Sequence, residues 1–124
     1  MKKPGGFTLV ELLVVMAIIA ALMSIAAPRY FNSLEHAKET TLRQSLSGMR
    51  EALDQFYGDN ARYPQSLEEL VERRYLRRLP MDPITERSDL WLTVAPPPDV
   101  PGLVADVRSA AQGQGRDGSA YGEW

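Results

Sequence analysis

Residues 7–27 read FTLVELLVVMAIIAALMSIAA, and only Thr8, Glu11 and Ser24 interrupt this apolar run. A helix of about 21 residues is about 31 Å long, which matches the hydrocarbon thickness of a bilayer. The residues after Pro28 are mixed and polar. The sequence therefore predicts one membrane-spanning helix followed by a small globular domain.

The residues around the apolar run indicate its orientation and distinguish it from a secretory signal peptide. Lys2 and Lys3 precede it and are expected to stay in the cytoplasm, which places the rest of the chain outside. A signal peptide would share this plan, with the small residues 24–27 near its cleavage point. Three features oppose that alternative. Glu11 would cost about 2.5 to 3.5 kcal/mol on insertion scales, Pro28 makes a poor cleavage position, and helical periodicity continues beyond it.

The junction at residues 5–14, GGFTLVELLV, is suited to proteolysis. Gly6 has no side chain, so a protease can approach the backbone closely, and Gly5 discourages a helix from running through the next bond. The junction resembles the leader junction of type IV pilins and type II secretion pseudopilins. That resemblance implies cleavage between Gly6 and Phe7 by a membrane-embedded prepilin peptidase on the cytoplasmic side, followed by methylation of the new amino group of Phe7.

The same resemblance implies how the chain is divided and where it resides. Residues 1–6 would be the cleaved leader, residues 7–28 the transmembrane and filament-core helix, and residues 29–124 a periplasmic pilin-like globular domain. The protein would be a single-pass protein of the bacterial inner membrane. Its expected partners are further copies in a helical filament, other pseudopilins, the prepilin peptidase, an inner-membrane assembly platform and the lipid bilayer.

Glu11 is the one acidic residue inside the apolar run, and we expect it to act in assembly. It lies four residues after Phe7, so the two share one face of a helix, and its carboxylate can meet a positive amino terminus. The sequence does not say whether that amino terminus belongs to the same chain or to a neighbour, although the resemblance implies the neighbour. Either partner would lower the cost of an intramembrane charge.

The segment after Pro28 keeps a helical pattern. Pro28 lacks an amide hydrogen and is expected to kink the helix locally. An apolar stripe then follows at helical spacing, formed by Leu42, Leu46, Met49, Leu53 and Phe56. We therefore expect one long helix that ends near Gly58, with Asp59 and Asn60 in a turn and with its second half packed on the domain.

Charged residues of the second half are expected on its solvated face. Glu39 with Arg43 and Arg50 with Asp54 are pairs four residues apart, which favours ion pairs along the helix. A cluster of arginines follows further along the chain, at positions 73, 74, 77 and 78. This cluster is compatible with a docking patch, but a solvated helix end is the simpler interpretation.

The remainder of the chain predicts a short helix and a small sheet. Ser66 and Glu69 have the spacing of a capping box at the start of a short helix. Residues 90–94 and 103–108 have strand composition, and two or three antiparallel strands should cover the helix. The loop YGDNARYP, residues 57–64, resembles the corresponding loop of major pseudopilins. The expected fold is thus α+β and pilin-like, with a long kinked N-terminal helix against a small antiparallel sheet.

Composition excludes several classes of function. The chain of 124 residues has 14 basic and 16 acidic residues and no cysteine. No basic stripe dominates, so we expect no nucleic-acid partner, and disulfides cannot stabilise the domain. His36 is the single histidine and has no serine or acid at the spacing of a hydrolase triad. We therefore expect no catalytic residues and a protein that is not an enzyme.

One candidate ligand is calcium, near the C-terminus. Asp106, Asp117 and Ser119 could bring oxygen ligands together, and hard cations prefer oxygen. The resemblance adds that major pseudopilins bind calcium in this region, through a segment similar to residues 115–119. A plain turn at Asp117-Gly118 is the alternative interpretation.

These observations favour a structural subunit of a periplasmic pseudopilus, most similar to the major pseudopilin of type II secretion. The resemblance implies that repeated addition of subunits at the inner membrane drives secreted proteins outward. One alternative is a type IV pilin or minor pilin for adhesion, motility or DNA uptake. Another is a periplasmic binding module that uses the helix only as a membrane anchor, which predicts tolerance of any apolar residue in that helix.

Overall fold

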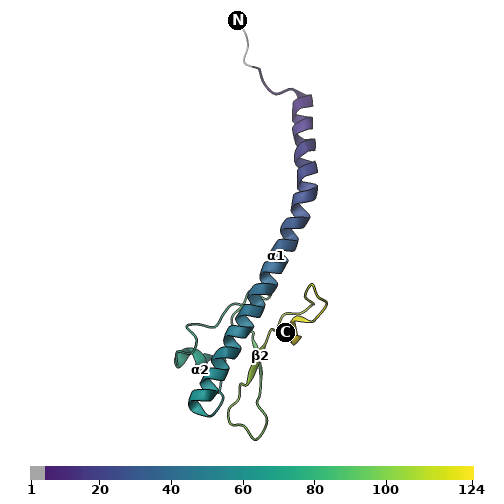
Figure 1. Cartoon of the computed structure of the whole chain (residues 1–124). Coiled ribbons are helices and arrows are strands. Elements are labelled where there is room, and N and C mark those ends of the chain that lie inside the picture. Colours follow the sequence, from purple (N-terminus) through teal and green to yellow (C-terminus); the bar gives the residue numbers. More distant parts are fainter. Residues whose placement is uncertain (1–4) are drawn as a thin grey trace. The chain divides into compact units, whose positions relative to one another are not determined.

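The computed structural model describes residues 5–124, so Lys2, Lys3 and most of the expected leader lie outside the described residues. Its elements are α1 (Leu9–Asn60), α2 (Leu67–Glu72), β1 (Leu92–Val94), β2 (Asp106–Arg108) and the short 3-10 helix η1 (Tyr121–Glu123) (Figure 1). Contacts within the chain separate a unit that ends at Glu35 from a second unit, His36–Trp124. We describe each unit separately.

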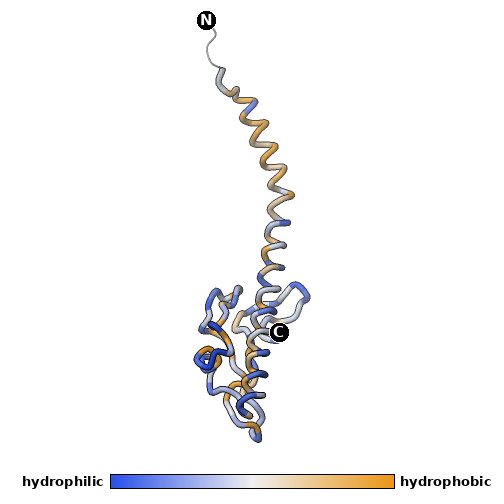
Figure 2. Tube along the Cα trace, turned by 60° about the vertical axis from the view of Figure 1, so that its left-hand side comes forward, coloured by the Kyte–Doolittle hydropathy of each residue, from blue (hydrophilic) through white to orange (hydrophobic). Residues whose placement is uncertain are grey.

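The first unit is the N-terminal part of α1. It is apolar along nearly its whole length, whereas apolar and polar residues alternate in the later part of the helix (Figure 2). Its large apolar side chains are exposed, for example Leu9 at 74% and Ile25 at 63%. α1 remains helical through Pro28. The expected long helix is therefore confirmed, and a kink at Pro28 stays a prediction.

The core of the second unit is built on the predicted apolar stripe. All five of its side chains are buried, with exposures of 0 or 1%, as expected for one face of an amphipathic helix: Leu42, Leu46, Met49, Leu53 and Phe56. The residues that pack around the stripe come from α2, the sheet and the loops between them: Leu67, Leu70, Trp91, Val104 and Val107. Figure 1 shows α2 and β2 beside this end of α1. This second unit, His36–Trp124, buries its apolar core within one chain and is called the soluble unit below.

The predicted end of α1 near Gly58 is wrong by two residues. The helix continues to Asn60, and Ala61 follows with a positive φ of 55°. The Asn60 side chain explains the extension, because its Nδ2 donates to the carbonyl of Phe56 at 3.0 Å and so satisfies a group of the last turn. Gly58 therefore lies inside the helix, and the turn begins after Asn60.

The sheet has two antiparallel strands, which confirms the α+β class, but each strand is shorter than predicted. β1 and β2 pair in a register that places Thr93 opposite Val107. Residues 103–105 were expected to belong to the second strand. The backbone N–H groups of Leu103 and Val104 instead donate to the carbonyl of Pro64, at 3.1 and 3.0 Å, so they are not available to a strand partner.

Candidate functional site

The predicted cleavage junction lies in an exposed, non-helical segment. Gly5, Gly6, Phe7 and Thr8 precede the first residue of α1, and the side chain of Phe7 is 89% exposed. No atom lies within 4 Å of the position that a Cβ would take at Gly5 or Gly6. A protease can therefore reach this backbone without displacing other parts of the chain. Cleavage at Gly6 and methylation of Phe7 stay predictions.

Thr8 and Glu11 cap the N-terminus of α1 with two reciprocal hydrogen bonds. The Thr8 N–H donates to Glu11 Oε2, and the Glu11 N–H donates to Thr8 Oγ1, both at 3.1 Å. The Thr8 carbonyl accepts the first helical bond, from Leu12 N–H. This is a capping box, with Thr8 at the N-cap and Glu11 three residues later. This capping box was not predicted, although the Thr-x-x-Glu spacing is visible in the sequence.

The capping box fixes the position of the carboxylate that we expect to act in assembly. One oxygen of Glu11 binds Thr8, and the other, Oε1, accepts no hydrogen bond from the described residues. The side chain is exposed in the single chain. It can therefore hold its own helix end and still offer one oxygen to the amino group of a second subunit.

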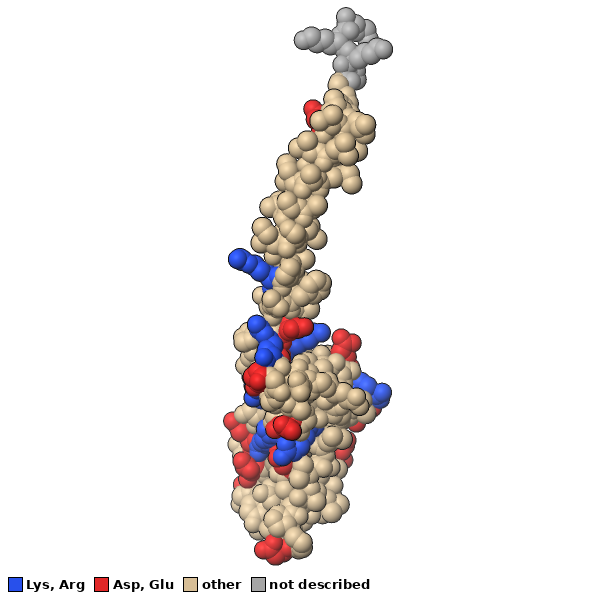
Figure 3. All heavy atoms as spheres, turned by 90° about the vertical axis from the view of Figure 1, so that its right-hand side faces the viewer, with Lys and Arg blue, Asp and Glu red and all other residues tan. Residues whose placement is uncertain are grey.

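A continuous apolar surface follows this carboxylate. On the face shown in Figure 3, the N-terminal part of the chain carries almost no charge, and the charged side chains gather on the residues after it. By length and composition, α1 is the one helix within residues 5–124 that could cross a membrane. Because this part of the helix has no polar face and its apolar side chains are not buried by any of residues 5–124, its surface requires lipid or other apolar helices.

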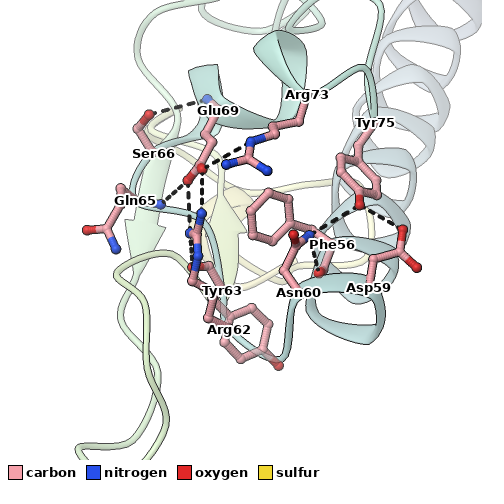
Figure 4. A network of polar contacts seen from close by, with 10 residues as sticks. All are labelled: Phe56, Asp59, Asn60, Arg62, Tyr63, Gln65, Ser66, Glu69, Arg73 and Tyr75. Atoms are coloured by element: carbon pink, nitrogen blue, oxygen red, sulfur yellow. Dashed lines mark hydrogen bonds and ion pairs between the residues drawn. The ribbon is translucent and has the colours of Figure 1, made fainter.

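A polar network holds the loop after α1, with Glu69 at its centre (Figure 4). Arg62 binds the Glu69 carboxylate with two N–H groups, at 3.2 and 2.9 Å, and the Gln65 N–H donates to it at 2.8 Å. Arg73 adds a longer ion pair of 3.8 Å. The bond from Arg62 is the largest cause that lowers the pKa of Glu69 to about 2. Bidentate pairing of this kind fixes orientation as well as charge.

The predicted capping box at Ser66 is only half present. Ser66 Oγ accepts from the Glu69 N–H at 3.3 Å, so the N-cap of α2 is confirmed. Glu69 does not return a bond to the Ser66 N–H and instead accepts from Gln65. Competition from Arg62 explains the difference, because it draws the carboxylate toward the loop.

The end of α1 is also fastened by Tyr75 (Figure 4). Its hydroxyl donates to Asp59 Oδ2 at 2.7 Å and accepts from Asn60 Nδ2 at 3.2 Å. The bond to Asp59 is the main reason that the pKa of Tyr75 is raised. The ring of Tyr75 packs on Phe56, with centroids 5.2 Å apart. The segment after α2 is therefore fixed by Tyr75 both to the core and to the end of α1. This suits a scaffold better than a moving lid.

The C-terminal loop brings together two of the three residues predicted to bind calcium. Asp117 Oδ1 accepts from the N–H and the hydroxyl of Ser119, at 3.0 and 2.6 Å. These bonds are the main cause that lowers the pKa of Asp117. Asp117 Oδ2 lies 3.3 Å from an Arg43 nitrogen. Asp106 is engaged elsewhere, because its Oδ1 accepts from Arg50 Nε at 2.8 Å.

The ion pairs predicted along α1 are therefore wrong. Arg43 pairs with Asp117 instead of Glu39, and Arg50 pairs with Asp106 instead of Asp54. Both arginines reach across to other parts of the domain, the C-terminal loop for Arg43 and β2 for Arg50. Helical spacing shows only which residues can meet on one helix, and it does not show what packs over them.

The arrangement does not fit a calcium ion as it stands. Calcium takes about six to eight oxygen ligands, most often from several acids. Within residues 5–124, no group of three or more histidine, cysteine, aspartate or glutamate side chains could hold a metal ion. The carboxylates of Asp117 and Asp106 each face an arginine. Calcium binding at Asp106, Asp117 and Ser119 stays a prediction.

Comparisons with known proteins add independent information. Residues 1–27 match the prokaryotic N-terminal methylation motif. The chain is 35% identical over 99 residues to type II secretion system core protein G of Klebsiella pneumoniae, covering 67% of this chain and 71% of the relative. The same protein of Vibrio cholerae is 35% identical over 98 residues, covering 67% of each chain. That of Pseudomonas aeruginosa is 32% identical, covering 66% and 69%.

This chain belongs to the type II secretion system core protein G family. The identity extends well beyond the 27 residues of the motif, so the assignment does not rest on the apolar helix alone. No solved structure matches the chain. Membership confirms the predicted resemblance to pilin-like proteins, and it agrees with a long N-terminal helix packed against a small sheet.

Proposed function

We propose that this core protein G is a structural subunit of a periplasmic pseudopilus that assembles at the inner membrane and drives type II protein secretion. The observation that carries the proposal is the N-terminal part of α1. Its apolar side chains stay exposed in the part of the chain that the structure describes, and its first turn holds one carboxylate, Glu11. Copies of such a helix satisfy one another in a bundle. The relatives, which are named as secretion core proteins, support the same role.

The N-terminal part of α1 takes part in each step of the proposed route: membrane insertion, cleavage and assembly. It inserts as a single-pass inner-membrane protein with residues 29–124 in the periplasm, and the prepilin peptidase removes residues 1–6. The assembly platform then transfers the helix from lipid to a filament of further copies and other pseudopilins. Glu11 guides the transfer, because its carboxylate recovers part of its desolvation cost when it faces the amino group of Phe7 on a neighbouring subunit.

A scaffold role accounts for the soluble unit better than catalysis does. The polar network around Glu69 joins α2 to the loop after α1 and leaves the carboxylate saturated. His36 is exposed on α1. The remaining alternatives are a type IV pilin and an anchored binding module. The identity to core protein G over about two thirds of the chain favours the pseudopilus over both.

Site-directed crosslinking tests the proposal directly. The chain has no cysteine, so one introduced in the apolar helix, such as Val14→Cys, forms disulfides only between copies. In cells that contain the other secretion components, we expect disulfide-linked dimers for Val14→Cys, because one cysteine per copy can join only two copies. Asp99→Cys, in a soluble loop, is the matched control for random collisions. Dimers at the control level, with secretion intact, would contradict a filament built on this helix.

The mass of the mature chain tests the first step. We expect a protein that begins at Phe7 and carries one added methyl group. A mature chain that starts near Ala27 would contradict the proposal, because the polymerising helix would have been removed.

A further inference from the structure

The C-terminal loop, residues 113–119, is fastened to α1 by two residues one turn apart. Glu39 Oε1 accepts from the Arg116 N–H at 2.8 Å. Arg43 lies 3.3 Å from Asp117 on the same loop. Residues four apart share one face of a helix, so Glu39 and Arg43 present an acceptor and a cation to the loop together.

Arg43 also connects the loop to the last residue of the chain. Its guanidinium carbon lies 3.8 Å from the centroid of the Trp124 ring, which is a cation–π contact. Trp124 Nε1 donates to Ser119 Oγ at 2.6 Å, and the ring packs so closely on Gly115 that a Cβ there would clash with it. One guanidinium therefore joins α1, the loop and Trp124.

We propose that Arg43 takes the place of a bound cation in this loop, so that residues 113–119 fold without calcium. Asp117 uses one carboxylate oxygen for Ser119 and turns the other toward Arg43. An arginine keeps its charge at every physiological pH, and its flat guanidinium can stack on a ring while it pairs with a carboxylate. Calcium would have to displace it from Asp117, and no group of three or more acidic side chains among residues 5–124 stands ready to hold the ion.

The test is thermal unfolding of the full chain in detergent, with calcium chloride or with the chelator EGTA. A ligand that binds only the folded state raises the melting temperature, so we expect the wild type to melt at the same temperature in both. Arg43→Gln should melt about 2 to 5 °C lower in both conditions. Arg77→Gln is the matched control, because Arg77 is exposed and makes no ion pair with the described residues.

Limited digestion with trypsin measures the loop itself, because the bond after Arg116 lies within it. We expect Arg43→Gln to accelerate cleavage after Arg116 by about threefold or more, since local opening exposes the bond, while calcium leaves the wild-type rate unchanged. Two results would each overturn the proposal. One is calcium raising the wild-type melting temperature or slowing its cleavage, with Asp117→Asn abolishing the effect. The other is Arg43→Gln matching the wild type in both measurements.

Discussion

The two units of this chain share one helix but satisfy their apolar side chains differently. In His36–Trp124, α1 buries one stripe against its own α2, sheet and loops. In the unit that ends at Glu35, every large apolar side chain from Phe7 onward is exposed. Burial within His36–Trp124 stabilises that unit in a single chain. The apolar side chains of the other unit are buried only when lipid or another copy is present. One helix can therefore supply the core of its own domain in one segment and a surface for assembly in the segment before it.

The largest difference between the two units is expected when a core side chain is truncated. Phe56 is completely buried, and Phe56→Ala should lower the free energy of unfolding of the soluble unit by about 3 to 5 kcal/mol. Leu13→Ala is the counterpart in the other unit, where the side chain is 57% exposed, and it should leave that free energy unchanged. Denaturant unfolding of the full chain in detergent, followed by tryptophan fluorescence, measures both. Equal losses would mean that the two units do not bury their side chains separately.

A substitution at Glu11 should affect assembly without affecting the stability of the soluble unit. Glu11→Leu removes both the capping carboxylate and the charge, so filaments and secretion should fall while the soluble unit melts as in the wild type. A loss of only about 1.4 kcal/mol per docking step lowers its equilibrium constant about tenfold. Electron microscopy of filaments and the amount of secreted cargo are the measurements, with the variant as the only copy.

The capping box allows the two roles of Glu11 to be separated. Glu11→Gln keeps an acceptor at the third helical position and can still cap Thr8, but it carries no charge. Thr8→Val removes the Oγ1 acceptor and keeps the charge. We expect Gln to fail in assembly and Thr8→Val to retain most of it. Filaments at normal yield with Gln would assign Glu11 to helix capping alone.

The sequence was most informative where one segment determines its own structure. The apolar run and the stripe from Leu42 to Phe56 could be predicted because helical spacing alone decides which side chains share a face. The contacts of Arg43 and Arg50 could not, because their partners, Asp117 and Asp106, lie more than 50 residues further along the chain. The capping box of Ser66 was predicted only in part for a different reason, because Arg62, seven residues before Glu69, competes for its carboxylate. Local pattern thus predicts elements, and tertiary competition decides the polar partners.

A smaller effect is expected at Gly102, where the soluble unit brings two backbone segments together. Gly102 has a φ of 114°, and a Cβ there would lie 2.4 Å from the carbonyl oxygen of Tyr63. Gly102→Ala should destabilise the unit by about 1 to 3 kcal/mol through strain. Gly118→Ala is the matched control, because Gly118 also has a positive φ, of 84°, but its Cβ position is open. If both variants unfold alike, backbone conformation and not close approach is the cause.

The smallest expected effect is a pH dependence that belongs to the soluble unit alone. The pKa of Glu69 is about 2 in the folded chain, below its ordinary value of 4.5, mainly because Arg62 donates to the carboxylate. A lowered pKa means that the unfolded chain takes up the proton first. The stabilisation is therefore complete above about pH 4.5 and is lost as the pH falls toward 2. Glu69→Gln cannot titrate at this position, so it should be less stable than the wild type at pH 6. The difference in stability between the two proteins should narrow steadily between pH 5 and pH 2.5.

Thermal unfolding of both full chains across that range measures this difference in stability. Double variants with Arg62→Ala show whether it depends on the Arg62–Glu69 pair. If the difference in stability does not change with pH, the charge of Glu69 does not contribute to the stabilisation by Arg62.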